Sequence, residues 1–254
     1  MSPVRADPDR LGPTGTRGAV NEEMHPTSTV SRSRTTHPPQ KTRAPRKPSV
    51  TKPPLPMASQ LLDATKRADV VTIPARTVLM IEGAGAPEGE SFQKAVGALY
   101  GVAYTLKFAR KKAGGSEFKI GPLEGRWWAA LEGTVFVQAP RDTWRWRLRL
   151  AMPDDVSEAE IAAAIEAATH KKGGKLEGSA EALTVSLERV PAQRVGRALH
   201  VGPYAEEGRT FNVIDQALAD AGVKAAFSHL EVYLGDPRRT SPARLRTVLM
   251  RETR

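Results

Sequence analysis

The stretch EGRTF, residues 207–211, repeats in altered form an earlier stretch, EGESF, residues 88–92. The two match as Glu-Gly-x-Ser/Thr-Phe, and each comes just after an expected strand and opens an expected helix. Each of these helices is followed by two further expected strands. The repeat therefore predicts a duplicated strand-helix-strand-strand unit, with pseudo-repeats at about 70–152 and 190–251.

Hydrophobic periodicity outlines the elements of both units. Strand-like stretches occupy 70–85, where Pro74 separates one or two strands, and 117–128, 143–153, 182–190, 193–204, 228–234 and 244–251. Helices are expected from about 91 to the glycine pair at 114–115, from 157 to 171, and through Phe211 to Gly222. These elements predict an α+β fold, a mostly antiparallel sheet with helices on one face and a ligand cleft on the other.

The segment before the first unit has a different composition. Residues 1–57 carry ten Lys or Arg against four Asp or Glu, hold 11 of the 20 prolines and contain no aromatic residue. Such a segment buries too little apolar surface to offset its ordering entropy. We predict a disordered, basic, proline-rich tail over 1–57 and a folded domain over 58–254. The tail is either a solubilising extension or a weak nucleic-acid arm, or translation begins at Met57.

The composition also excludes several functions. The chain has no cysteine and only five histidines, with no two at helical ligand spacing, so we expect no metal site. The glycines of EGAGAPEG, 82–89, do not fit a phosphate-binding or dinucleotide-binding loop, and we expect no cofactor. The sequence also lacks the nucleophile elbow of a Ser-His-Asp hydrolase. No apolar run is long enough for a membrane span, and we expect a cytoplasmic protein.

Two glutamates occupy equivalent places in the two units. Glu124 lies in PLEGRWW, 122–128, and Glu231 in SHLEVYL, 228–234, each on the first strand after a helix. We expect both carboxyl groups to face one cleft on the helix-free side of the sheet, where aromatic surroundings would raise their pKa values and suit them to acid-base catalysis. The alternative is that they are surface residues or partners of nearby arginines.

Several further side chains are candidates for ligand contact. Strand alternation places His229 and Tyr233 on the face of Glu231, and Trp128 on the face of Glu124 with Trp127 opposite, although a bulge at Gly125 would exchange the two tryptophans. The other candidates are Tyr204 at a cleft mouth, and Tyr104 and Trp146, which are either ligand walls or packing residues.

Several longer stretches are similar to a known family. VLMIEGAG (78–85), ALYGVAYTLKF (98–108), PLEGRWW, LHVGPYAEEGRTF (199–211) and EVYLGDPRRTSPARLRTVL (231–249) resemble the GyrI-like small-molecule-binding family over roughly 70–251. They are most similar to its stand-alone branch, which includes hydrolases of cyclopropane-bearing, DNA-alkylating natural products. The resemblance implies a multidrug-binding cleft between two halves, with a buried glutamate and aromatic walls.

Three hypotheses follow from the sequence. The first is a hydrolase that detoxifies hydrophobic electrophiles through Glu124 and Glu231 and confers resistance. The second is a sensor or sequestering protein for bulky aromatic compounds, without turnover. The third, DNA binding through the basic tail, ranks last, and no helix-turn-helix is found that would indicate a transcription factor.

Overall fold

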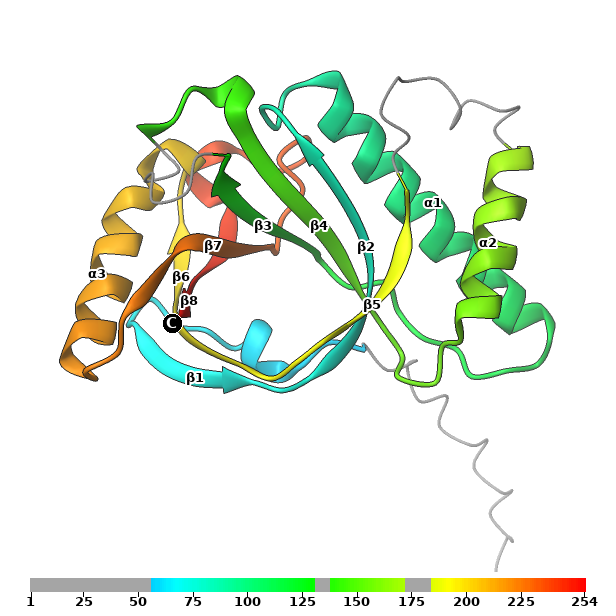
Figure 1. The fold of residues 1–254 in the computed structure, drawn as a ribbon, viewed down its shortest axis with the longest axis horizontal. Helices are drawn as coiled ribbons and strands as arrows, with labels where there is room; N and C mark the ends of the chain where they lie inside the picture. The colour runs from blue at the N-terminus through cyan, green and yellow to red at the C-terminus, as the bar shows by residue number, and fades with distance from the viewer. Residues whose placement is uncertain (1–55, 131–137, 172–183) are drawn as a thin grey trace, which may run out of the picture. The chain divides into compact units, whose positions relative to one another are not determined.

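The computed structural model describes residues 56–130, 138–171 and 184–254, so the expected tail lies outside it except for Pro56 and Met57. The described residues form one eight-stranded sheet with three α-helices (Figure 1). The helices are α1 (Glu90–Lys112), α2 (Glu158–Lys171) and α3 (Glu207–Asp220). The strands are β1 (Asp69–Ile73), β2 (Arg76–Ala84), β3 (Leu123–Ala129), β4 (Trp144–Met152), β5 (Ser186–Val190), β6 (Gln193–Val201), β7 (Ala225–Tyr233) and β8 (Arg246–Thr253).

The duplicated unit is confirmed. One half runs β2-α1-β3-β4 and the other β6-α3-β7-β8, and the sheet order is β1-β6-β8-β7-β3-β4-β2-β5 with every pairing antiparallel. The halves therefore meet where β7 pairs with β3, and the order of strands reads symmetrically outward from that junction. In the view of Figure 1, α3 lies to the left of β7 and β3, and α1 and α2 lie to the right.

Two outer strands link the halves. β1 precedes the first half but pairs with β6 of the second, and β5 precedes the second half but pairs with β2 of the first. Each ends at a similar tripeptide, Ile-Pro-Ala at 73–75 and Val-Pro-Ala at 190–192. Proline donates no backbone hydrogen bond, so the tripeptide separates two strands where a single long one would otherwise run.

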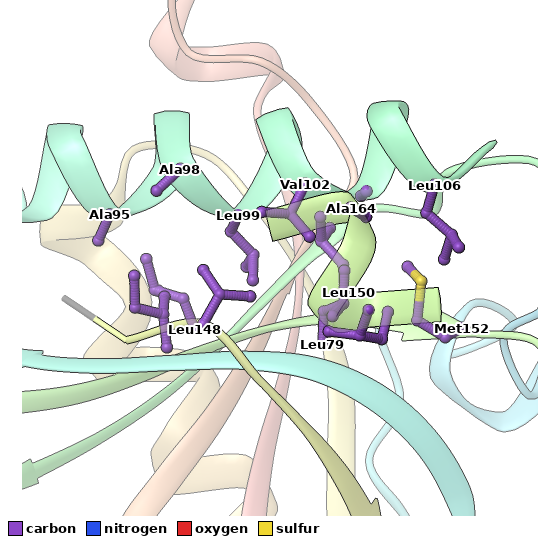
Figure 2. Close-up of a cluster of buried hydrophobic side chains, with 14 of the residues drawn as sticks. Leu79, Ala95, Ala98, Leu99, Val102, Leu106, Leu148, Leu150, Met152 and Ala164 are labelled. Carbon is purple, nitrogen blue, oxygen red and sulfur yellow. The ribbon is translucent and has the colours of Figure 1, made fainter. Parts of the chain in front are cut away.

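The largest core lies between α1, α2 and the first half of the sheet. The helical spacing of Leu99, Val102 and Leu106 turns one side of α1 toward Leu148 and Leu150 of β4 (Figure 2). α2 begins with a capping box, in which Ser157 and Glu160 exchange side-chain to backbone hydrogen bonds. No helix among the described residues is long and apolar enough to cross a membrane.

A smaller core lies under α3. Phe211, Ile214 and Leu218 pack on Ala198 and Leu249 of the second half of the sheet. Gly196 of β6 permits this approach, since a Cβ there would lie 2.8 Å from Leu218 and 2.9 Å from Ile214. α1 and α3 cover the same face of the sheet, which we call the helix face.

The opposite face carries apolar cover as well. Met57, Leu61 and Ala64, around the short 3-10 helix η1 (Ser59–Leu61), pack on apolar side chains of the sheet. Arg197 of β6 fixes this segment, because its guanidinium binds Asp63 at 2.5 Å, Asp69 at 2.9 Å and the carbonyl of Gln60. This cover could not be predicted from the sequence, because residues 56–64 show no helical or strand periodicity.

The packing of Trp146 gives a test of the core. A Cβ on Gly83 would lie 2.2 Å from the indole of Trp146, which is fully buried. We expect Gly83→Ala to lower the free energy of unfolding by about 1–3 kcal/mol through overpacking. Urea denaturation would measure this, with Gly97→Ala in α1 as the matched control. A Cβ at Gly97 meets nothing within 4 Å, so that variant should gain about 0.5–1 kcal/mol.

Candidate active site

The register between β3 and β7 decides which candidate residues share a face. Gly125 lies opposite Glu231, Glu124 opposite Val232, and Trp127 opposite His229. Because neighbours on a strand point to opposite faces, Glu231 lies on the helix face and Glu124 on the other. The prediction that the two carboxyl groups share one helix-free face is therefore wrong. Glu124 lies on the face opposite the helices, whereas Glu231 lies on the helix face.

Glu124 lies in a cluster of arginines. It is 0% exposed, and its Oε2 accepts a hydrogen bond of 2.6 Å from Nη2 of Arg76. Arg149 lies directly opposite it on β4, and burial lowers the pKa of Arg149, while the charges of Glu188 and Glu124 act against that shift. Glu124 is therefore a partner of nearby arginines, which was the alternative prediction for this residue. The ion pair between Arg76 and Glu124 connects β2 to β3 across the intervening β4.

Glu231 is the centre of a different cluster on the helix face. The carboxyl group is 7% exposed, and its Oε1 lies 2.7 Å from Nε2 of His229, which is 2% exposed. Phe211 of α3 packs against the imidazole, with ring centroids 4.7 Å apart. A strand and a helix therefore hold His229 in place, and His229 in turn orients Glu231.

Tyr233 joins the cluster from the next position on the same face. Its hydroxyl accepts a hydrogen bond of 2.9 Å from Nε1 of Trp127. Burial raises the pKa of Tyr233 well above its ordinary value, and the charge and hydrogen bonding of Glu231 raise it further. Gly125 makes the arrangement possible, because a Cβ there would lie 2.9 Å from both the Trp127 nitrogen and the Tyr233 oxygen.

The structure adds a second carboxyl group that the sequence reasoning missed. Glu207, the first residue of α3, is 9% exposed. Burial and the charge of Glu231 raise its pKa to about 10. The EGRTF repeat marked this position, but its equivalent Glu88 is exposed and binds Arg141 at 2.7 Å, so the repeat carried no signal for burial.

Tyr204 covers the cluster from the turn before α3. Its ring meets that of Tyr233 edge to face at 6.1 Å and is 39% exposed. Burial raises the pKa of Tyr204 to about 12, with further contributions from the charges of Glu231, Glu207 and Asp236. The role of Tyr204 in ligand binding stays a prediction.

The remaining candidates lie apart from Glu231. Trp128 lies on the opposite face under the guanidinium of Arg126, 5.3 Å from its ring centroid. Trp146 is fully buried against Phe92 of α1, which makes it a packing residue. Tyr104 is 45% exposed on α1 and stacks between Tyr100 and Phe108. A cavity of about 620 Å³ between α1 and α2 contains none of the candidate residues.

The fold and this cluster define a class of protein, a two-fold repeated α+β domain with a cluster of acidic and aromatic side chains at the junction of its halves. An uncharacterized conserved protein from Listeria innocua is 31% identical, with a TM-score of 0.68 over 77% of this chain and 96% of that one. A hydrolase from Listeria innocua is 30% identical over the same shares, with a TM-score of 0.67. The chain belongs to the family of these Listeria proteins. No protein-family model and no curated protein matches it.

The environment of Glu124 gives a test of its role. We expect Glu124→Gln to lower the free energy of unfolding by about 3–5 kcal/mol, because it leaves the buried guanidinium of Arg76 without its charge partner. Chemical denaturation would measure the loss. The matched control is Glu88→Gln, which removes an exposed ion pair with Arg141 and should cost less than about 1 kcal/mol. Equal stability of the two variants would contradict a structural role for Glu124.

Proposed function

We propose that the protein is a GyrI-like small-molecule-binding protein that hydrolyses hydrophobic electrophiles with a strained ring, such as cyclopropane-bearing DNA-alkylating compounds, and so detoxifies them. One observation carries the proposal: Glu231 lies at the junction of the two halves, bonded to His229 at 2.7 Å and surrounded by Tyr233, Tyr204 and Trp127. A carboxylate in such surroundings is a group that can take a proton from water.

Hydrolysis of such a ring requires a base for the attacking water and a proton donor for the carbonyl oxygen. An activated cyclopropane conjugated to a dienone opens when water attacks the strained carbon and the bonding electrons move toward the carbonyl oxygen. Glu231 removes a proton from the attacking water, and His229 holds the carboxylate in orientation. The carbonyl oxygen must also receive a proton as the ring becomes a phenol.

The aromatic residues support a flat, hydrophobic ligand. Tyr100, Tyr104 and Phe108 follow one another at four-residue spacing on α1, with ring centroids 6.3 Å and 6.2 Å apart. Tyr104 and Phe108 are 45% and 59% exposed. The charge of Asp236 raises the pKa of both Tyr100 and Tyr204, and this shared influence supports a ladder that begins near the Glu231 cluster. The family relation to a Listeria hydrolase supports the hydrolytic half of the proposal.

The alternative is a protein that binds aromatic compounds without converting them. The exposed ladder on α1 favours it, because aromatic rings recognise flat ligands by stacking whether or not chemistry follows. Both functions use the same surface, and the fate of a bound compound separates them.

Turnover gives the first test. The wild-type protein, incubated with a compound that carries a dienone-conjugated cyclopropane, should yield a product heavier by one water in mass spectrometry. Glu231→Gln should lower the rate by about 100-fold or more, since the base is lost. Glu124→Gln should keep the wild-type rate per folded molecule. Recovery of unchanged compound from a stoichiometric complex with wild-type protein would establish binding without hydrolysis.

The aromatic ladder gives the second test. Tyr104→Ala and Phe108→Ala should each weaken binding of the same compound by about 1 kcal/mol, or several-fold in Kd, through the lost stacking surface. Both side chains are exposed, so stability should hardly change. Titration calorimetry would measure the affinity, with Val213→Ala as the control, because Val213 is 51% exposed on α3. Unchanged affinity in both ladder variants would remove the ladder from the binding surface.

A further inference from the structure

We propose that Glu207 is a second catalytic residue of this site, the acid that protonates the carbonyl oxygen of the substrate; the inference rests on the proposed hydrolysis. It extends the site from β7 to the first turn of α3 and replaces Glu124 as the partner of Glu231.

Two ring contacts fix where Glu207 faces. Tyr204 meets Tyr233 at 6.1 Å, and Phe211 meets His229 at 4.7 Å. Along the chain Glu207 lies between Tyr204 and Phe211, one helical turn before Phe211 and on the same side of α3. On β7, Glu231 lies between Tyr233 and His229 on the helix face. The two contacts therefore bracket the two carboxyl groups and bring them face to face.

The carboxyl group of Glu207 is available for a substrate. Its Oε1 is buried and has no hydrogen-bond partner among the described residues, although the residue is 9% exposed. A buried carboxyl oxygen without a partner is costly. The adjacent Glu206 is instead exposed and paired with Arg209 at 2.9 Å.

The other repeat shows that the helix itself does not require this burial. Glu88 holds the equivalent position in EGESF, remains in solvent and binds Arg141 of the segment before β4. Both glutamates precede the phenylalanine that packs their helix on the sheet, Phe92 in one repeat and Phe211 in the other. Only Glu207 lies beside a second carboxyl group, so its burial belongs to the site.

The groups that face Glu207 keep it protonated. Glu231 and Tyr233 from β7 and Tyr204 from the turn before α3 interact electrostatically with Glu207, and His229 lies behind Glu231, 2.7 Å from its carboxyl oxygen. Burial and the charge of Glu231 raise the pKa of Glu207 to about 10. Two neighbouring carboxyl groups thereby take different roles, one as the base and one as the acid.

The proton balance of the reaction is then complete. Glu231 takes one proton from water as the oxygen of that water bonds to the strained carbon. The carbon–carbon bond of the cyclopropane breaks at the same time. The electron pair moves through the dienone to its oxygen, which takes the proton of Glu207 and becomes a phenol. Proton transfer from Glu231 to Glu207 restores both groups, and the net reaction adds one water.

The test compares Glu207→Gln with Glu206→Gln, the same substitution at an adjacent carboxyl group that is exposed. With the cyclopropane compound, Glu207→Gln should lose about 100-fold or more in kcat with little change in Kd, and Glu206→Gln should match the wild type. Glu207→Asp keeps an acid at a shorter reach and should retain part of the rate. The wild-type rate should fall as pH rises toward 10, and the residual rate of Glu207→Gln should lack that decline.

A second measurement needs no turnover. The folded state holds the Glu207 proton up to about pH 10, whereas an unfolded carboxyl releases it near its ordinary value of 4.5. The stability contributed by this group is therefore full below pH 4.5 and is lost as pH rises toward 10. The stability of Glu207→Gln relative to wild type should rise with pH across that interval, while that of Glu206→Gln should not.

Each outcome decides the proposal. A stability difference independent of pH would mean that Glu207 is ionised at neutral pH, which overturns its role as the acid. Full activity in Glu207→Gln, with Glu231→Gln inactive, would refute Glu207 alone and leave the hydrolysis standing. A wild-type protein that never forms the water adduct would refute both.

Discussion

The antiparallel pairing of β3 with β7 is the contact on which the rest of the structure depends. It joins the two halves at the centre of the sheet, and its register sets Gly125 opposite Glu231. Because Gly125 has no side chain, the Trp127 indole and the Tyr233 hydroxyl meet beside the carboxyl group. A shift of one residue would move every candidate side chain of one strand to the other face.

The buried glutamates differ in the charge of their neighbours. Glu124 lies among Arg76 and Arg149 on one face, where an ion pair offsets the cost of burial. On the other face Glu231 has an imidazole as its partner, and burial and the charge of Glu231 raise the pKa of Glu207. Burial without a positive partner keeps a carboxyl group neutral, which suits it to acid catalysis and not to structural support.

The sequence correctly predicted which neighbours on one strand share a face. Alternation placed His229 and Tyr233 with Glu231 and separated Trp127 from Trp128, because side-chain direction along one strand has a fixed period. It did not reveal that Glu124 and Glu231 face opposite sides, since that depends on the register between two strands far apart in the chain. Glu207 was missed because the same motif holds an exposed glutamate in one repeat, Glu88, and a buried one in the other, so the motif does not predict burial.

By itself the sequence determined the elements, their duplication and the antiparallel α+β class, because hydrophobic period, caps and repeats are properties of neighbouring residues. The tertiary structure alone decided that residues 56–64 cover one face and that β1 and β5 cross between the halves. It alone brought Glu207 to Glu231. Pairing register and burial come from contacts between distant segments, and no local pattern in the chain records them.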